Sequence, residues 1–511
     1  MMCRKGVVAS SHPLASFQGV SVLLKGGNVF DAAIATSAML CVVQNNLCGL
    51  GGDTFAILKE GERIEGINGS GRAGINATID FFEKMQLKSI PQRGPLSAVT
   101  VPGIVDAWNI IHSRYCTFEL KELLAPAIEY AENGFPLTPK YVESIRASAP
   151  IFERFKGWCS IFLIDGKIPQ EGYILKQKAL AKSLRLIAEE GTETFYKGNL
   201  ADKIVKGLQK EGGLLTHDDF SQHKTTLQQP MHQSYRGLEV YETAPNSQGA
   251  AVLLWLKMLE EFPQLPNDTS KLVELFSSTY KLVNKKRSSF IGDPDFLPLP
   301  SDFFSAKEAN DEERLGPDRA ALQQGDTTYF AVADSEGNCA SIIQSNYMGF
   351  GSGIVPDDTG IVMQNRGCYF TLDEAHHNCL APRKRTFHTL CASLGIKGSN
   401  PAFVLGSMGG DIQPQIHVQL ITDIVDLGMN IQEAIDSPRW AIPNTIYERP
   451  RILFVEEPLA YKIKRRVLGG LEVQTIQNLS SRVGHAQGIM FLDDALSGGA
   501  DPRGDGIAIG F

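Results

Sequence analysis

The sequence contains few cysteines, and their spacing excludes the sites that cysteines usually build. Nine occur in 511 residues, an odd number, without a CxxC pair or the spacing of a zinc site. Disulfide frameworks belong to small secreted domains, whereas this chain is long and poor in cysteine. We therefore expect reduced thiols in an intracellular protein, and no metal site built from them.

Long hydrophobic runs are also missing. The longest apolar stretch, residues 32–43, is about twelve residues long and ends at Gln44. A membrane-spanning helix needs roughly 20 apolar residues. A secretory signal needs an apolar region of about 7–15 residues near its start, and the opening segment lacks one. These absences predict a cytoplasmic protein with no membrane partner.

The chain has no surplus of positive charge. Its net charge of −8 argues against nucleic acid or an anionic membrane as the main partner. Hydrophobic residues make up 43% and charged residues 21%, proportions typical of a soluble globular protein. Because 511 residues exceed one compact core, we expect either about three modules or one large layered fold.

Several familiar catalytic motifs are absent as well. The sequence has no HExxH, no P-loop and no GxSxG elbow. Its ten histidines are scattered, apart from His376-His377, and carboxylate pairs such as Asp357-Asp358 are typical of turns or surfaces. Neither a metal ion nor an organic cofactor is predicted.

The patterns that are present indicate an α+β protein, with strands near both ends of the chain and helices dominating residues 102–290. Residues 291–326 lose all periodicity and become polar, as a linker or a functional segment does. The predicted helices are 31–43, 120–134, 177–191, 248–262, 270–290 and 415–429. The predicted strands are a pair within 54–68, one within 237–245, a hairpin within 327–347, and segments 359–365, 401–410, 484–494 and 501–511.

The junction Asp326-Thr327 ends the polar segment and begins the clearest hairpin in the chain. A hydroxyl residue at a newly exposed chain start acts as a nucleophile, while its own α-amine, with an ordinary pKa of about 7.7–8.0, accepts the proton. A turn centred on Glu336 places Ser345 opposite Thr327, within reach of that hydroxyl or amine. The alternatives are a strand that simply starts with threonine and a register shifted by one residue, which turns Ser345 to the other face.

A second candidate is the glycine pair Gly409-Gly410, which ends a predicted strand just before a helix. Glycine permits backbone angles that turn N–H groups towards a substrate, and such donors stabilise the oxyanion of a tetrahedral intermediate. The alternative is an ordinary tight turn between the strand and the helix.

Eight segments, in order along the chain, resemble the γ-glutamyltransferase (glutathione hydrolase) family of N-terminal nucleophile hydrolases. They are ASSHPLAS (9–16), GGNVFDAAIA (26–35), TVPGIVDAW (100–108), IGDPDF (291–296), GDTTYFAVADSEGN (325–338), GFGSGIV (349–355), APRKRTFHT (381–389) and GSMGGDIQPQ (406–415). The resemblance covers almost the whole chain and implies a four-layer αββα fold. It also implies that no cofactor is needed.

The resemblance further implies a precursor that cleaves itself between Asp326 and Thr327. The products would be a large subunit, residues 1–326, and a small subunit, residues 327–511, that stay together as a heterodimer. In the family the new terminal threonine is the nucleophile, a hydroxyl residue eighteen positions later assists it, and a glycine pair forms the oxyanion hole. These roles fall here on Thr327, Ser345, Gly409 and Gly410.

The residues that hold the γ-glutamyl group depart from the family pattern. Ser70 takes the place of an arginine that grips the α-carboxylate, and an arginine follows two residues later. The two positions that hold the α-amine carry Arg366 and Tyr369. A serine pair has become His388-Thr389, and an asparagine near the assisting hydroxyl has become a tyrosine. The predicted substrate-binding residues are therefore Arg72, Tyr347, Arg366, His388 and Thr389.

The family pattern predicts an enzyme that cleaves a γ-glutamyl amide through a threonine acyl-enzyme and passes the acyl group to water or an amine. One alternative is an acylase of the same chemistry, because Arg366 and Arg72 would attract a glutaryl-type acyl group that lacks the ammonium. Another is a non-catalytic paralogue, against which the retention of Thr327, Ser345 and both glycines argues. Arg366 could also be an ordinary partner of Asp357 or Asp358.

Overall fold

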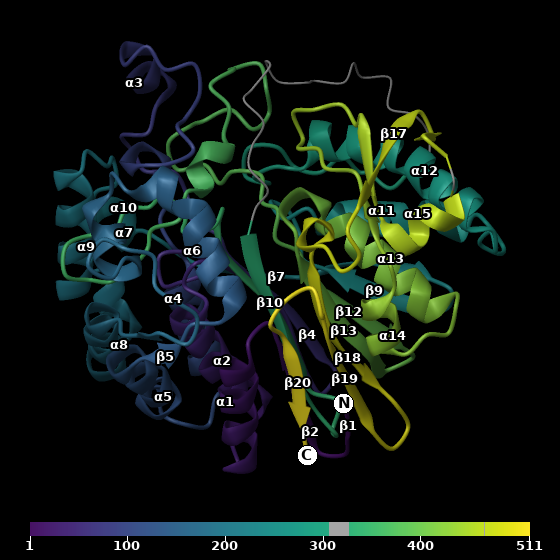
Figure 1. The fold of residues 1–511 in the computed structure, drawn as a ribbon, viewed down its shortest axis with the longest axis horizontal. Helices are drawn as coiled ribbons and strands as arrows, with labels where there is room; N and C mark the ends of the chain where they lie inside the picture. The colour runs from purple at the N-terminus through teal and green to yellow at the C-terminus, as the bar shows by residue number, and fades with distance from the viewer. Residues whose placement is uncertain (306–325, 464) are drawn as a thin grey trace.

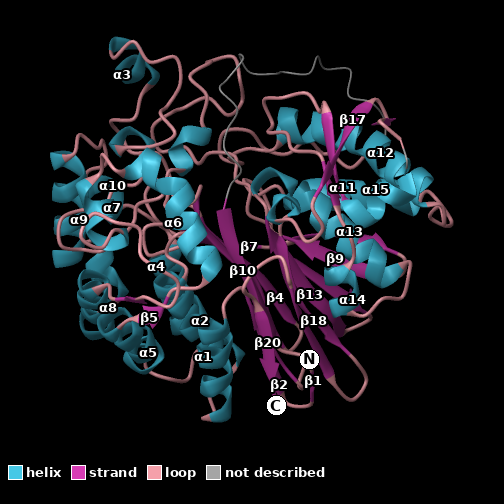
Figure 2. Cartoon of the chain, in the orientation of Figure 1, coloured by secondary structure: helices cyan, strands magenta, loops and turns pink. Residues whose placement is uncertain are grey.

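Two seven-stranded sheets lie face to face at the centre of the molecule (Figures 1 and 2). The computed structural model describes residues 1–305, 326–463 and 465–511. The first sheet has the order β20 (Ile507–Gly510), β2 (Gly6–Ser10), β10 (Asp326–Asp334), β11 (Cys339–Tyr347), β3 (Asp53–Glu60), β4 (Arg63–Gly69) and β7 (Thr226–Gln228). The second has the order β1 (Met2–Cys3), β19 (Leu496–Ala500), β18 (His485–Phe491), β13 (Asn400–Met408), β12 (Ser393–Lys397), β9 (Leu238–Glu242) and β8 (Met231–Tyr235).

The space between the sheets is filled by side chains that alternate along each strand. In β10, Tyr329, Ala331 and Ala333 pack towards the second sheet, while Phe330 and Val332 pack on the opposite face against helices. Side chains of a strand point alternately to its two faces, and both faces of this strand are covered. That explains why β10 reads as an almost continuous apolar run rather than an alternating one.

Each sheet carries a layer of helices on its outer face, so the predicted four-layer αββα fold is confirmed. The first layer contains α1 (Pro13–Leu24), α2 (Val29–Val43), α4 (Ile104–Tyr115), α5 (Leu120–Asn133), α6 (Pro139–Phe152), α7 (Lys156–Phe162), α8 (Lys178–Glu190), α9 (Asn199–Lys210) and α10 (His217–Ser221). The second contains α11 (Gly249–Glu260), α12 (Thr269–Phe290), α13 (Gln413–Val425) and α14 (Ile431–Asp436).

Smaller elements surround these layers. A four-stranded sheet, β14 (Trp440–Ala441), β15 (Ile452–Glu456), β17 (Leu471–Ile476) and β16 (Val467–Leu468), lies with α15 (Glu457–Ile463) beside the second helical layer. The remaining short elements are β5 (Phe135–Pro136), β6 (Ile174–Leu175) and α3 (Ile79–Lys84). None of the helices in the described parts of the chain is both long and apolar enough to cross a membrane.

Helix α2 packs against β10 and β11, the strands that carry Thr327 and Ser345. All of its residues are buried, which explains a sequence that is apolar or small on every side. Asn28 begins it with a capping box, accepting from the Asp31 backbone N–H while the Asp31 carboxylate accepts from the N–H of Asn28. The helix predicted at 31–43 is therefore confirmed and extends two residues further towards the N-terminus.

The other predicted elements are mostly found, but the structure differs from the prediction in several places. The segment 359–365 was expected to be a strand, but it forms no ladder and has only one isolated bridge, between Gly51 and Met363. The strands that were not predicted are β1, β2, β5–β8, β12, β14–β17 and β19. Residues 306–325, most of the predicted polar segment, lie outside the described residues. Because β20 pairs with β2 and β2 pairs with β10, strands from both ends of the chain join the sheet that holds the hairpin, and the core is one layered fold rather than three modules.

Candidate functional site

The β10–β11 hairpin brings Thr327 and Ser345 together. Its register pairs Tyr329 with Ile343, so the turn centres on Glu336 as the sequence predicts. A bulge between Asp326 and Thr328 falls at the open end of the ladder. There the Thr327 hydroxyl donates a hydrogen bond to Ser345 Oγ over 3.1 Å, and both residues are about 1% exposed.

Ser345 also contacts the peptide bond that precedes Thr327. Its hydroxyl donates to the carbonyl oxygen of Asp326 over 2.7 Å and accepts from the Tyr347 N–H over 2.7 Å. A chain of hydroxyl contacts therefore runs from the Thr327 side chain to the carbonyl of its own preceding residue. Burial raises the pKa of the Asp326 carboxyl from 3.8 to about 6, and Arg93 opposes that increase.

Asp53, on the next strand, extends the row of facing side chains, and sequence reasoning missed it. The β11–β3 register places it opposite Ser345. Its carboxylate accepts from Gln364 Nε2 over 2.9 Å and lies 3.1 Å from His388 Nε2. Burial raises the pKa of Asp53 to about 7, with Arg366 as the main opposing charge. The only sequence signal was an acidic residue at the start of a buried strand.

His388 is neutral in this environment. Its Nδ1 accepts from the Leu390 N–H over 3.3 Å, so the hydrogen resides on Nε2 and is donated to Asp53. Burial, reinforced by the Arg366 charge, lowers the pKa of His388 well below its ordinary value. The predicted residues His388 and Thr389 therefore lie at the Asp53 end of the row, on the approach to β12.

Arg366 is fully buried, and only some of its N–H groups have hydrogen-bond partners among the described residues. Its Nη1 donates to Thr389 Oγ1 over 3.1 Å, and its guanidinium carbon lies 4.0 Å from the centre of the Tyr347 ring. Within the described residues, Arg366 Nε and Nη2 and the Tyr347 hydroxyl have no hydrogen-bond partner. Buried polar groups are normally paired, so these three atoms are suited to hydrogen-bonding an oxygen-rich ligand.

The carboxylates of Asp357 and Asp358 do not pair with the Arg366 guanidinium. Asp357 pairs with Lys210, and the described residues hold no ion pair between Arg366 and Asp357 or Asp358. The hydroxyl of Tyr369 donates to Asp411 over 2.6 Å, and Asp411 in turn lies 3.6 Å from Arg287.

Arg72, the other arginine predicted to bind substrate, is engaged elsewhere. Its Nη1 lies 3.1 Å from Asp293 and donates to the Arg383 carbonyl, and its Nη2 pairs with Asp295. Both aspartates belong to the IGDPDF segment. The structure thus brings Tyr347, Arg366, His388 and Thr389 together, and it gives Arg72 two acidic partners of its own.

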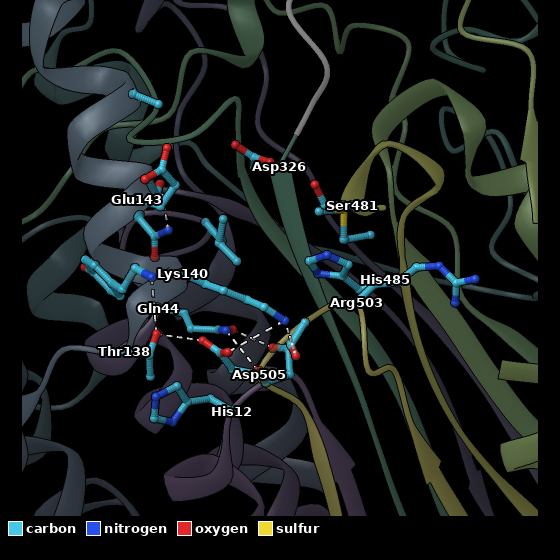
Figure 3. Close-up of a pocket in the computed structure, with 18 of the residues that line it drawn as sticks. His12, Gln44, Thr138, Lys140, Glu143, Asp326, Ser481, His485, Arg503 and Asp505 are labelled. Carbon is cyan, nitrogen blue, oxygen red and sulfur yellow. Dashed lines mark hydrogen bonds and ion pairs between the residues drawn. The ribbon is translucent and has the colours of Figure 1, made fainter. Parts of the chain in front are cut away.

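The glycine pair lies where β13 ends. Gly409 has φ +147° and Gly410 has φ +58°, values that L side chains rarely adopt. A Cβ on Gly406 would lie 2.3 Å from the Tyr329 ring, so β13 packs directly on β10. Met408, which precedes Gly409, and Asp326, which precedes Thr327, line one pocket (Figure 3), so the glycine pair lies near the nucleophile candidate.

Gln248, also missed from the sequence, connects the glycine pair to the Arg366 side of the site. Its Nε2 donates to the carbonyl oxygens of Gly410, over 2.9 Å, and Thr389, over 2.7 Å. Its Oε1 accepts from Arg287 over 3.0 Å. A single buried amide therefore fixes the turn after β13 relative to the residues around Arg366.

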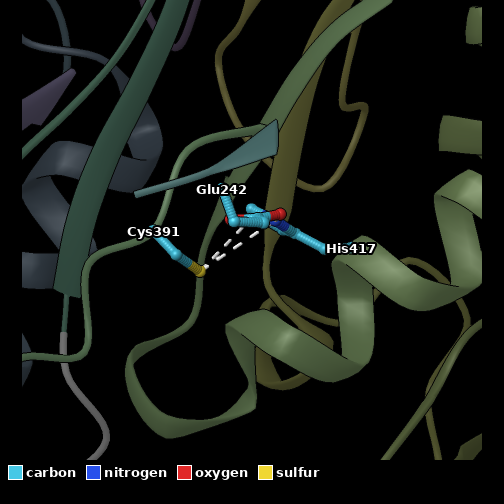
Figure 4. Close-up of side chains that lie close together, drawn as sticks. All are labelled: Glu242, Cys391 and His417. Carbon is cyan, nitrogen blue, oxygen red and sulfur yellow. Dashed lines mark hydrogen bonds and ion pairs between the residues drawn. The ribbon is translucent and has the colours of Figure 1, made fainter. Parts of the chain in front are cut away.

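One group of potential metal ligands lies within the described residues (Figure 4). Glu242, Cys391 and His417 are all buried, and their ligand atoms lie within 4.8 Å of one another. Glu242 Oε1 and His417 Nδ1 already form a 2.8 Å contact, and the backbone N–H of Cys391 donates to Gln413 Oε1 over 3.0 Å. These contacts tie β9, the approach to β12 and the start of α13 together.

Two facing sheets between helical layers, with a threonine–serine pair at one end, define the class of N-terminal nucleophile hydrolase folds. Solved structures agree: the cephalosporin acylase from Bacillus halodurans has a TM-score of 0.91 and 34% sequence identity, over 100% of this chain and 96% of that one. The family model described as Gamma-glutamyltranspeptidase matches residues 15–511. The chain belongs to the gamma-glutamyltranspeptidase family.

Curated relatives cover the chain from end to end. The glutathione hydrolase-like YwrD proenzyme of Bacillus subtilis (strain 168) is 40% identical over 518 residues, covering 99% of this chain and 98% of that protein. The oxamate amidohydrolase proenzyme of Klebsiella pneumoniae is 33% identical over 522 residues, again covering 99% and 98%. This protein is thus an enzyme-family member similar to both glutathione hydrolases and acylases.

Proposed function

We propose that the chain is a self-cleaving amide hydrolase whose Thr327 becomes the nucleophile, and that its substrate carries a carboxylate on the acyl group without an α-ammonium. The observation that carries the acyl preference is the buried Arg366 guanidinium, with two nitrogens unpartnered among the described residues and the Tyr347 hydroxyl beside it. The proposal takes the glutaryl-type alternative in preference to a γ-glutamyl substrate.

Self-cleavage follows from the contacts around the Asp326–Thr327 bond. Thr327 Oγ attacks the Asp326 carbonyl carbon and passes its proton to Ser345 Oγ, which gives its own proton towards the carbonyl oxygen. As the C–N bond breaks, the proton on that oxygen passes to the nitrogen and the C=O bond re-forms, which leaves an ester and a free α-amine on Thr327. Water then hydrolyses the ester, giving subunits 1–326 and 327–511, which the shared sheet holds together as a heterodimer.

In the mature enzyme the same hydroxyl acts on substrate. Thr327 Oγ attacks the amide carbon while its α-amine takes the proton, and the N–H groups of Gly409 and Gly410 stabilise the oxyanion. The α-ammonium then protonates the leaving nitrogen, and an acyl-enzyme ester forms. Water or an amine accepts the acyl group and frees Thr327. No step requires a metal or an organic cofactor.

The charge around Arg366 supports an acyl group that ends in a carboxylate. A γ-glutamyl group would bring an ammonium towards Arg366, and like charges repel strongly where water is excluded. The carboxylate of Asp411, which could hold an ammonium, is already paired with Tyr369 and Arg287. The names of two relatives, an oxamate amidohydrolase and a cephalosporin acylase, also support acyl groups other than γ-glutamyl.

The decisive experiment compares two anilides that differ only in the α-amine. The purified mature enzyme is assayed with glutaryl-p-nitroanilide and γ-glutamyl-p-nitroanilide, and kcat/KM is measured for each. We expect the glutaryl compound to be preferred by roughly tenfold or more, since one repelled charge in a desolvated site costs at least about 1.4 kcal/mol. A preference for the γ-glutamyl compound would restore the glutathione-hydrolase assignment.

Loss of both activities would instead favour a non-catalytic paralogue. That outcome is checked separately on a denaturing gel, because self-cleavage needs no external substrate. A wild-type chain that stays uncut, or a small fragment that starts at a residue other than Thr327, would contradict the nucleophile assignment.

A further inference from the structure

A carboxylate, a thiol and an imidazole meet in the interior of the protein, on three segments that are distant in sequence (Figure 4). Glu242 ends β9, Cys391 lies just before β12, and His417 belongs to α13. Each of the three residues is 0% exposed. Glu242 and His417 are 175 residues apart, so the spacing of the cysteines, which predicted no metal site, does not reveal this group.

The distances within the group are close to those around a shared metal ion. His417 Nδ1 lies 2.8 Å from Glu242 Oε1, and Cys391 Sγ lies 4.0 Å from His417 Nδ1 and 3.9 Å from its Nε2. One ligand atom from each residue lies within 4.8 Å of the other two. Bonds of about 2.0–2.3 Å to a tetrahedral zinc ion separate its ligand atoms by roughly 3.3–3.6 Å. The observed separations bracket that range, and side-chain movements of about an ångström bring all three groups onto one ion.

The group also has oxygen atoms that are not used by the protein. Ser393 lies opposite Glu242 in the register of β9 and β12. Neither the Ser393 hydroxyl nor Glu242 Oε2 makes a hydrogen bond of ordinary geometry within the described residues. Buried polar atoms normally have partners. Oxygen lone pairs left open beside a thiol and an imidazole are suited to a cation.

The balance of charge favours a divalent cation. A thiolate and a carboxylate together carry two negative charges, and a neutral imidazole adds none. One zinc ion leaves the set without net charge, which offsets much of the cost of burying ions away from water. Sulfur, imidazole and carboxylate are all zinc ligands, whereas magnesium and calcium take oxygen ligands.

We propose that Glu242, Cys391 and His417 bind one structural zinc ion. A hydroxyl or water oxygen at Ser393 completes the tetrahedron. The Cys391 sulfur binds as thiolate and its proton passes to solvent, so at least one proton is released for each ion, and no group is oxidised or reduced. Because all three protein ligands are buried, the site is closed to substrate, as structural zinc sites are.

The ion would hold together the segments that carry the catalytic candidates. Cys391 follows Thr389 by two residues, and its backbone N–H donates to Gln413, which begins α13 shortly after the glycine pair. Glu242 lies six residues before Gln248, which bonds to both of these segments. The zinc site is separate from the reacting groups, and the inference does not rest on the proposed function.

The test measures the metal content of the purified protein. Wild type, Cys391→Ala and His417→Gln are produced in zinc-supplemented medium, freed of loosely bound ions by gel filtration, and analysed by inductively coupled plasma mass spectrometry. Cys339→Ala is the matched control, because Cys339 is also a fully buried cysteine but lies outside the ligand group. Circular dichroism establishes that each variant is folded.

We expect about one zinc ion per chain in wild type and Cys339→Ala, and less than about 0.2 in the two ligand variants. A strong chelator should lower the melting temperature of the wild type by about 5 °C or more and leave that of Cys391→Ala unchanged. A wild type with less than about 0.1 zinc ion per chain, or ligand variants that keep the wild-type content, would overturn the inference.

A spectroscopic measurement decides the question if the ligand variants do not fold. Wild type is produced with cobalt in place of zinc, and its absorption spectrum is recorded. A charge-transfer band from thiolate to cobalt supports the site, and a spectrum without one overturns it. None of these measurements requires amide cleavage, so an inactive protein that holds zinc would contradict the proposed function alone.

Discussion

Thr327 Oγ1 lies 3.1 Å from Ser345 Oγ, across two antiparallel strands of the central sheet. The serine is also bonded to the carbonyl oxygen of Asp326, so a single hydroxyl contacts both the attacking group and the bond to be cleaved. This arrangement leads directly to a prediction about processing.

Thr327→Ala should abolish self-cleavage, because no other group replaces the attacking hydroxyl, and Ser345→Ala should slow it by about a hundredfold, the usual contribution of one proton-transfer group. Ser345→Thr, which keeps the hydroxyl, should retain most of the rate. The measurement is the fraction of uncut chain on a denaturing gel over time. Ser341→Ala is the control, since Ser341 lies on the same strand and bonds to Tyr329 and Ser393 away from the junction. Ser345→Ala cleavage at the wild-type rate would refute the role of this serine.

Arg366→Gln should lower kcat/KM for a carboxylate-bearing acyl donor by roughly 30-fold or more, since removing one partner of a buried charge pair costs at least about 2 kcal/mol. The ratio of glutaryl to γ-glutamyl activity should fall with it. Arg185→Gln, which removes an exposed pair with Glu132, is the matched control and should leave both activities unchanged. An unchanged ratio in Arg366→Gln would mean that the guanidinium does not contact the acyl group.

The buried carboxyl of Asp53 should make substrate affinity depend on pH near neutrality. Its pKa is raised from 3.8 to about 7, so below pH 7 it is protonated and leaves the Arg366 charge for the substrate. As pH rises through 7 the carboxylate forms and competes, and KM for a carboxylate-bearing donor should rise by roughly threefold or more between pH 6 and 8. Asp53→Asn should flatten that rise. A wild-type KM that is constant over this range would contradict the assignment.

The same shift has a consequence for stability. A carboxyl with a raised pKa holds its proton more tightly when folded, so its contribution to stability is lost as pH rises from about 4 to 7. Asp53→Asn should show a smaller decline over that window, measured as the denaturant midpoint at each pH. A decline identical to that of the wild type would show that Asp53 titrates normally.

Gly409→Ala should lower kcat by about a hundredfold, because it disturbs an oxyanion donor. A Cβ there would lie 2.9 Å from Ile412 Cγ1, at a φ of +147° that alanine avoids. Gly398→Ala is the matched control: its φ of +64° is also positive and unfavourable for alanine, but its Cβ would meet open space in the β12–β13 turn. Similar losses of kcat in both variants would attribute the effect to backbone strain alone.

The fold and half of the site follow from patterns that are local in the sequence. That Thr327 faces Ser345 can be calculated from the position of one turn, because the centre of a two-stranded hairpin fixes which residues pair along both strands. The turn at the glycine pair can be predicted from the sequence because positive φ angles at the end of a strand favour glycine. The prediction of a strand at 359–365 is wrong because an apolar run in the sequence does not reveal whether a neighbouring strand is available for pairing.

Sequence alone therefore determined the hairpin that pairs Thr327 with Ser345, the glycine turn and the layered α+β architecture. Tertiary structure alone decided what surrounds them. Asp53 meets His388 across 335 residues of chain, and Gln248 bridges Thr389 and Gly410, contacts that no periodicity encodes. Only the tertiary structure shows that Arg366 is buried and that two of its nitrogens have no hydrogen-bond partner among the described residues, since burial and hydrogen bonding depend on neighbours distant in sequence.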